Sequence, residues 1–187
     1  TRAARLRFGA LADAGGAEAA MERALGLRPS DARVQFAAMS LFDQMGEIEG
    51  AARHAAWLLA HDFGDASLRA SLHFRQAESA ALQGDIGAAA SSLRAALAQD
   101  PGSAAARGAL VEQTLAGGDG FEVVREFDEL AESSPPGVGR AALHRASAAL
   151  SLALRADVEG ALARFRKAGD EDPGDLVSRR ASVMLLA

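Results

Sequence analysis

A recurrent spacing constrains the fold of this 187-residue chain more than any other feature. A short sequence phrase ends four times in proline and once in phenylalanine, and successive closing residues lie 34, 38, 34 and 38 positions apart. The closing residues are Pro29, Phe63, Pro101, Pro135 and Pro173. A period of this length is typical of arrays of small supersecondary units that stack on one another. The spacing therefore predicts a repeat protein.

Each phrase also has an inner pattern of small and apolar residues. A small or β-branched residue precedes each closing residue by twelve positions, and an apolar residue follows it four positions later. The first set is Ala17, Ala51, Ala89, Val123 and Ala161, and the second is Met21, Ala55, Leu93, Phe127 and Phe165. Residues four apart lie on one face of a helix. The pattern predicts one amphipathic helix before every closing residue, and we expect Ala89 and Ala161 to be buried where helices touch.

The clearest unit, residues 70–103, reads as a helical hairpin. A helix over 70–83 is interrupted by Gly84 and Asp85, which are typical of a helix end and of the next N-cap. A second helix follows and stops at Asp100-Pro101, because proline cannot continue it. Over the whole chain we expect eleven helices in antiparallel pairs and no strand, with breaks at Gly46, Gly84 and Gly118. The 38-residue units gain about one helical turn, which we place near 66–69 and 138–141.

These residues resemble the tetratricopeptide repeat, a 34-residue helix–turn–helix unit with an alanine, an aromatic residue four positions on and a closing proline. The resemblance covers units at 1–31, 32–65, 66–103, 104–137 and 138–175, and a partial unit at 176–187. It implies an all-α fold in which antiparallel helix hairpins stack into a right-handed α/α superhelix, forming one domain over 1–187. The first helices lack the family's usual tryptophan, glycine and tyrosine, so a different class of helical repeat stays open.

The resemblance also implies a binding surface and a function. In the family, the first helices line a concave groove that binds extended peptides or partner helices. The matching positions are Arg33, Phe36, Ser40, Asp43, Gln44, Ser71, Phe74, Glu78 and Glu112, and the fifth unit adds the apolar Leu143, Leu150 and Leu154. We expect Phe36 and Phe74 to lie near each other. The implied function is a non-enzymatic scaffold for a protein or peptide partner. The alternative is a repeat segment of a larger protein, such as a transferase or an envelope export machine.

Composition excludes several other classes of function. The net charge of −5 argues against non-specific nucleic-acid binding, which needs clustered basic residues. No apolar run is long enough for a membrane span. The absence of cysteine excludes disulfides and leaves the cellular compartment open, with the cytoplasm slightly favoured over the periplasm. The family's chaperone-binding clamp uses lysine, arginine and asparagine on the first helices. It is disfavoured because the chain has no asparagine and its only lysine, Lys167, lies in a second helix.

The residues that could take part in catalysis or metal binding are better explained by roles in packing, turns or the solvent-exposed surface. His54 and His61 could share a helix face, but no third ligand is evident, so neither a metal nor another cofactor is expected. Glu122, Glu126, Asp128 and Glu129 surround Arg125 and indicate a solvated face with local ion pairs. The glycines between 117 and 120 are expected to form an interhelix turn. We expect Trp57 to pack against a neighbouring hairpin.

The last predicted helix lacks a partner in the pattern. Leu176, Val183, Leu185 and Leu186 belong to a first helix without the second helix that would complete its hairpin. We therefore expect an apolar face to be open for another element, either a second copy of the chain or further sequence. A second copy of the chain, bound through this helix, is the partner that the sequence itself suggests.

Overall fold

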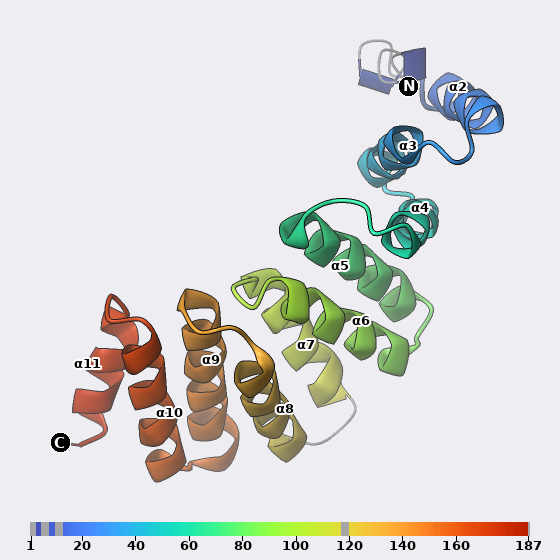
Figure 1. Cartoon of the computed structure of the whole chain (residues 1–187). Coiled ribbons are helices and arrows are strands. Elements are labelled where there is room, and N and C mark those ends of the chain that lie inside the picture. The colour runs from blue at the N-terminus through green and yellow to red at the C-terminus, as the bar shows by residue number, and fades with distance from the viewer. Residues whose placement is uncertain (1–2, 5–7, 10–12, 117–119, 187) are drawn as a thin grey trace. The chain divides into compact units, whose positions relative to one another are not determined.

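The computed structural model describes residues 3–4, 8–9, 13–116 and 120–186, and this part of the chain is helical without any β-strand (Figure 1). Ten helices lie within it: α2 (Ala14–Leu27), α3 (Ala32–Met45), α4 (Ile48–Ala60), α5 (Ala66–Leu82), α6 (Ile86–Gln99), α7 (Ala104–Ala116), α8 (Gly120–Ser133), α9 (Val138–Arg155), α10 (Val158–Glu171) and α11 (Leu176–Met184). The all-α prediction is confirmed over these residues. The eleventh predicted helix, at the start of the chain, falls mostly outside them.

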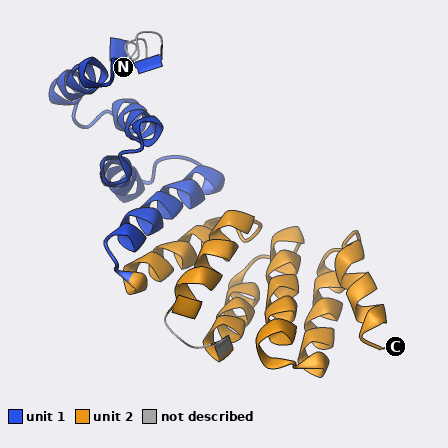
Figure 2. Cartoon of the chain, turned by 180° about the vertical axis from the view of Figure 1, so that it is seen from behind, with its two compact units in different colours: residues 1–85 blue, residues 86–187 orange. Residues whose placement is uncertain are grey.

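The chain divides into two compact units, residues Thr1–Asp85 and Ile86–Ala187 (Figure 2). In the first unit, α3 packs against α2 and α4, and α4 packs against α5. In the second unit, α9 packs against both α8 and α10, and α10 packs against α11. Sequence neighbours are thus spatial neighbours within each unit, as expected for stacked hairpins. The single domain over 1–187 stays a prediction.

Helix ends follow the turn chemistry that the sequence predicts. Asp31, Asp65 and Asp175 each accept a hydrogen bond from a backbone N–H in the first turn of α3, α5 and α11, at 2.9, 2.9 and 3.1 Å. Gly46 and Gly84 have φ angles of +75° and +74°, the left-handed conformation that glycine adopts without strain. The predicted breaks at Gly46 and Gly84 are confirmed, whereas Gly118 lies outside the described residues.

The end of α9 uses alanine where glycine is favoured. Ala156 has a φ of +50° and caps α9 with its N–H on the carbonyls of Ser151 and Leu152. A Cβ in this conformation is strained. We expect Ala156→Gly to raise the free energy of unfolding by about 1 kcal/mol, as measured by urea denaturation. Ala149→Gly, at an exposed position inside α9, is the matched control and should lower it by about 1 kcal/mol. Destabilisation by both substitutions would contradict the strain.

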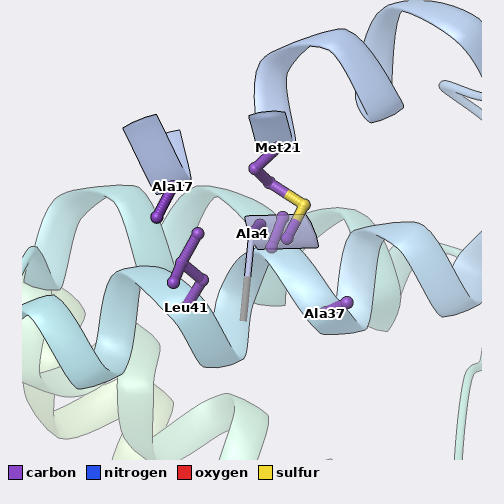
Figure 3. Close-up of a cluster of buried hydrophobic side chains, with 6 residues drawn as sticks. Ala4, Ala17, Met21, Ala37 and Leu41 are labelled. Atoms are coloured by element: carbon purple, nitrogen blue, oxygen red, sulfur yellow. The ribbon is translucent and has the colours of Figure 1, made fainter. Parts of the chain in front are cut away.

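The repeated phrase forms the core of both units. All ten of its small and apolar positions are buried, from Ala17 and Met21 to Ala161 and Phe165. In Figure 3, Ala17 and Met21 of α2 lie against Ala37 and Leu41 of α3. The buried small residues allow helix axes to approach closely, which is why alanine recurs there. The prediction that Ala89 and Ala161 are buried is confirmed.

Enlarging either alanine should therefore overpack a contact between helices. Ala89 and Ala161 have no accessible surface. We expect Ala89→Leu or Ala161→Leu to lower the free energy of unfolding by about 1–3 kcal/mol in thermal or chemical denaturation. Ala149→Leu, at the exposed α9 position, should change it by less than about 0.5 kcal/mol. Unchanged stability of both buried variants would show that the predicted register is wrong.

The longer repeats add their extra turn to the first helices. α5 has 17 residues and α9 has 18, against 14 in α3 and 13 in α7. The first helices of the 38-residue units are therefore the longer ones, as predicted, and the place of the extra turn within each helix, near 66–69 and 138–141, stays a prediction. Because the insertion is close to one full turn, the buried face of the rest of the helix keeps its direction.

Candidate functional site

Most of the predicted partner-binding residues lie on two helices of the first unit. We name the surface of α3 and α5 that carries them the α3/α5 face; its residues are Arg33, Phe36, Ser40, Asp43 and Gln44 on α3, and Ser71, Phe74 and Glu78 on α5. Half of these side chains are exposed and half are partly buried, and none is fully buried. Glu112 is exposed on α7, in the second unit. The pattern thus identified residues accessible to a partner, and their role in binding stays a prediction.

Arg75 joins the two helices at the centre of the α3/α5 face. Its guanidinium pairs with Asp43 of α3, with 3.0 Å between Nη2 and Oδ2, and with Glu78 of α5, with 2.6 Å between Nη1 and Oε2. Burial acts to lower the pKa of Arg75, but hydrogen bonds and charge from Glu78 and Asp43 raise it on balance. Sequence reasoning missed Arg75. Its spacing from Glu78 was the one available signal, because the contact with Asp43 spans 32 positions.

The polar groups of the face differ in what they leave free for a ligand. The Ser40 hydroxyl donates to the Phe36 carbonyl at 2.9 Å, and the Ser71 hydroxyl donates to the Leu68 carbonyl at 2.7 Å. Both hydroxyls therefore keep only acceptor capacity. The Arg33 guanidinium is exposed and makes no ion pair with any residue that the structure describes. Arg33 is therefore the free cation of this face.

The two phenylalanines have different surroundings. The Phe36 ring packs beside the Phe63 ring, with 6.0 Å between centroids, and joins the core cluster of Met39, Leu58 and Leu72. Phe74 is partly buried and is not part of the cluster around Met21 or of the cluster around Leu58. Phe36 is thus held by the closing residue of its own repeat. Phe74 is the aromatic side chain of the face that is more available to a ligand.

The apolar stretch expected in the fifth unit is only partly accessible. Leu143 is fully buried, Leu150 is partly buried and Leu154 is exposed. The expectation that Leu143 lines a groove is wrong. Because α9 packs against both α8 and α10, a wider arc of its surface is covered than a single hairpin contact would cover.

The acidic residues of α8 face in two directions. Arg125 pairs with Glu122 at 3.4 Å and with Glu129 at 3.8 Å, and all three side chains are exposed, as predicted. The prediction is wrong for Glu126 and Asp128. Glu126 is buried and pairs with Arg94 of α6, while Asp128 turns towards α9 and α10. Both carboxylates bond to neighbouring helices, contacts that a pattern within one helix does not reveal.

Asp128 is the centre of a polar network inside the second unit. It accepts a hydrogen bond from the Ser147 hydroxyl at 2.6 Å and is held by Arg164, whose Nη2 lies 2.6 Å from Oδ2 and whose Nε lies 3.0 Å from Oδ1. Burial acts to raise the pKa of Asp128, but the hydrogen bonds from Arg164 and Ser147 lower it on balance. Asp128 is therefore ionised at neutral pH and ties three helices together.

His54 and His61, the two histidines considered as metal ligands, contact other side chains of the first unit. His54 is buried, and its Nδ1 lies 2.6 Å from Gln35 Oε1, while Gln35 Nε2 donates to the Pro29 carbonyl at 2.6 Å. Nδ1 is therefore the protonated nitrogen. Burial and Arg53 lower the pKa of His54.

His61 is exposed, and its ring stacks on the Trp57 ring with 3.8 Å between the ring centroids. Across the described ranges, no three His, Asp or Glu side chains converge as they would around a metal ion.

Trp57 packs against the core cluster of α3, α4 and α5, as expected.

The terminal helix α11 agrees in part with the prediction of an open apolar face. Leu176, Val183 and Leu186 are exposed, whereas Leu185 packs against the cluster of Ala161 and Phe165. In the part of the chain that the structure describes, none of the helices combines the length and apolar composition that a membrane crossing requires.

The hairpins of both units, with their buried alanines and closing prolines, define an all-α helical-repeat protein. No family model matches the chain, and no curated protein matches it. Similar solved structures are TPR proteins. YrrB, described as a TPR protein with an unusual peptide-binding site, is 19% identical over 95% of this chain and 87% of its own, with a TM-score of 0.53. MamA is 15% identical over 89% of this chain and 93% of its own, with a TM-score of 0.54.

A third similar structure, a thermophilic TPR protein of Thermus thermophilus, is 20% identical over 95% of this chain and 92% of its own, with a TM-score of 0.45. A TM-score below 0.5 does not establish a common fold. The similarity in fold is therefore shown by YrrB and MamA, whose TM-scores are above 0.5. The particular fold is that of the tetratricopeptide repeat. At these identities the likeness concerns the fold alone.

Proposed function

We propose that this chain is a non-enzymatic scaffold that binds a peptide segment of a partner protein on the α3/α5 face. The observation that carries the proposal is the row of accessible side chains on α3 and α5, centred on the pairing of Arg75 with Asp43 and Glu78. An aromatic group on such a surface can bury apolar surface of a ligand. Fixed charges beside it can set the position of the ligand along the surface.

Individual residues of the face suit different parts of a peptide. Phe74 offers partly buried aromatic surface, and Leu82, at the end of α5, is 66% exposed. Arg33 offers an unpaired guanidinium for a carboxylate. The ion pairs of Arg75 keep Asp43 and Glu78 in place before a ligand arrives, which reduces the entropy lost on binding.

The test is a selection of peptides that bind the full chain, followed by calorimetry with the best binder. We expect Phe74→Ala to weaken binding by about ten- to a hundredfold, as for an interface anchor. Arg33→Ala should weaken binding of peptides that carry a carboxylate at the matching position. Arg125→Ala, an exposed arginine of α8 with comparable local ion pairs, is the control and should leave affinity unchanged.

Selected peptides that bind equally well to the wild type and to a Phe74→Ala/Arg33→Ala double variant would overturn this site. Circular dichroism of Phe74→Ala and of Arg33→Ala separates loss of binding from loss of folding. Neither side chain is fully buried, so we expect both variants to keep the helical signal of the wild type.

A second candidate role is an interface on α11 for another element, either a second copy of the chain or further sequence. The observation that favours it is the exposed apolar surface of α11, where Leu176, Val177 and Val183 are 74%, 63% and 69% exposed. Equilibrium sedimentation of the full chain tests whether this surface joins two copies. Monomers at all concentrations would exclude self-association, and a combined Leu176→Ser/Val183→Ser variant should dissociate any dimer.

A further inference from the structure

We infer that a hollow between α8, α9 and α10 binds a guanidinium group, the side chain of an arginine on a partner protein. This site lies in the second unit and is independent of the α3/α5 face. It consists of two adjoining depressions, of about 240 and 360 Å³, which share Glu132 of α8, His144 of α9 and Lys167 of α10.

The charges around the hollow leave a negative excess. Two of its cations are already committed, because Arg164 pairs with Asp128 and Arg140 pairs with Glu171. The remaining charged groups are Glu132, Asp170 and Lys167. None of these three makes an ion pair with another described residue. Two free carboxylates against one ammonium favour a cationic ligand and oppose an anionic one.

His144 supplies an observation that is independent of the charges around the hollow. Its side chain is only 6% exposed, it lines both depressions, and its Nδ1 is buried without a hydrogen-bond partner. Buried polar atoms in folded proteins almost always have a partner. Burial lowers the pKa of His144, and Lys167 and Arg140 contribute to the shift, so the ring is neutral at pH 7 and does not repel a cation.

A guanidinium fits this set of groups better than an ammonium. It is planar, carries five N–H donors and pairs with carboxylates through two parallel hydrogen bonds, whereas an ammonium is a strongly hydrated point charge. A planar cation also stacks on an aromatic ring, and the neutral imidazole has one acceptor nitrogen.

The extent of the hollow favours an arginine within a protein over a free small molecule. Its lining on α10 runs from Ala163 to Glu171, eight residues apart and therefore about 12 Å along the helix. A guanidinium occupies only a part of that length. The rest of the wall is available to the residues on either side of the arginine.

Calorimetric or NMR titration of the full 187-residue chain tests the inference. The probe is N-acetyl-arginine-methylamide, and its citrulline analogue is the matched neutral ligand. We expect binding of the arginine probe only, with a shift of the His144 imidazole signals. Glu132→Gln, at an exposed position, should weaken binding about tenfold. Lys167→Gln should strengthen it about threefold by removing a like charge. Glu129→Gln is the control, because Glu129 is exposed on α8 and outside the hollow.

Several results would overturn the inference. Equal binding of the citrulline analogue would show that the charge is not recognised. Weaker binding in Lys167→Gln would indicate a site for anions. Methylguanidine that binds as tightly as the blocked arginine would assign the site to a small molecule instead of a partner protein. An unchanged affinity in Glu132→Gln would place the ligand elsewhere.

Discussion

Replacing Asp128 with alanine is expected to lower the free energy of unfolding by about 3 kcal/mol. The substitution leaves Arg164 without its main partner while its side chain is only 19% exposed, and it removes the acceptor of the Ser147 hydroxyl. An unpaired charge in such a setting costs more than the pair contributes. Urea denaturation followed by circular dichroism measures the effect.

Two further variants distinguish the loss of the Asp128 hydrogen bonds from the loss of a negative charge alone. Glu129→Ala removes an exposed carboxylate of the same helix and should change the free energy of unfolding by less than about 0.5 kcal/mol. Asp128→Asn keeps an acceptor for Ser147 but loses the charge, so it should fall between the two. Equal stability of Asp128→Ala and the wild type would contradict the network.

The pH dependence of the same pair of proteins provides a further readout. The pKa of Asp128 is lower in the folded chain than its ordinary value of 3.8. Its contribution is therefore fully present above about pH 4 and is lost as the pH falls through the folded pKa. The difference in stability between the wild type and Asp128→Ala should shrink in acid. A difference that stays constant down to about pH 2 would mean that the carboxylate charge is not what stabilises the wild type.

The second large effect concerns Phe36, where the structure separates two residues that the sequence pattern treats alike. We expect Phe36→Ala to lower the free energy of unfolding by about 2–3 kcal/mol, somewhat below the value for a fully buried phenylalanine because the ring is partly exposed. Its ring contacts Phe63 and the cluster of Leu58 and Leu72. Thermal and urea denaturation test this directly.

Phe74→Ala is the comparison for this prediction. Phe74 is not part of the cluster around Met21 or of the cluster around Leu58, so its replacement should cost less than about 1 kcal/mol. Peptide affinity should show the opposite order at constant folded fraction, with the larger loss in Phe74→Ala. If both variants lose the same stability, Phe74 is core as well, and the accessible surface of α5 is narrower than the α3/α5 face as defined above.

The local pattern was sufficient for the repeats because the forces involved act over short distances in the chain. Gly46 and Gly84 end their helices where a left-handed residue is needed, and the aspartates before α3 and α5 cap the next helix. The buried phrase from Ala17 to Phe165 follows from spacing alone. A different class of helical repeat stayed open from the sequence because the first helices lack the family's signature residues.

The candidate site could be predicted only in outline. The pattern selected the first-helix positions on α3 and α5 but missed Arg75, and it placed Leu143 on the surface. It also assigned Glu126 and Asp128 to solvent, although they pair with arginines 32 and 36 positions away. Helical periodicity gives the direction of a side chain relative to its own helix, but not which side chain of another helix it meets.

The sequence by itself determined the architecture of each repeat, since helix formation, capping and the burial of an alanine-rich face are set within about 38 residues. The tertiary structure decided which charged groups pair between helices, whereas pairs within one helix, such as Arg125 with Glu122 and Glu129, follow from the sequence spacing. Arg75 meets Asp43, Arg164 meets Asp128 and Glu126 meets Arg94 across different helices, and these pairs depend on distances that form only when the hairpins pack. A direct ion pair needs its nitrogen and oxygen within about 4 Å of each other, so a pair between two helices cannot be assigned before the packing of those helices is known.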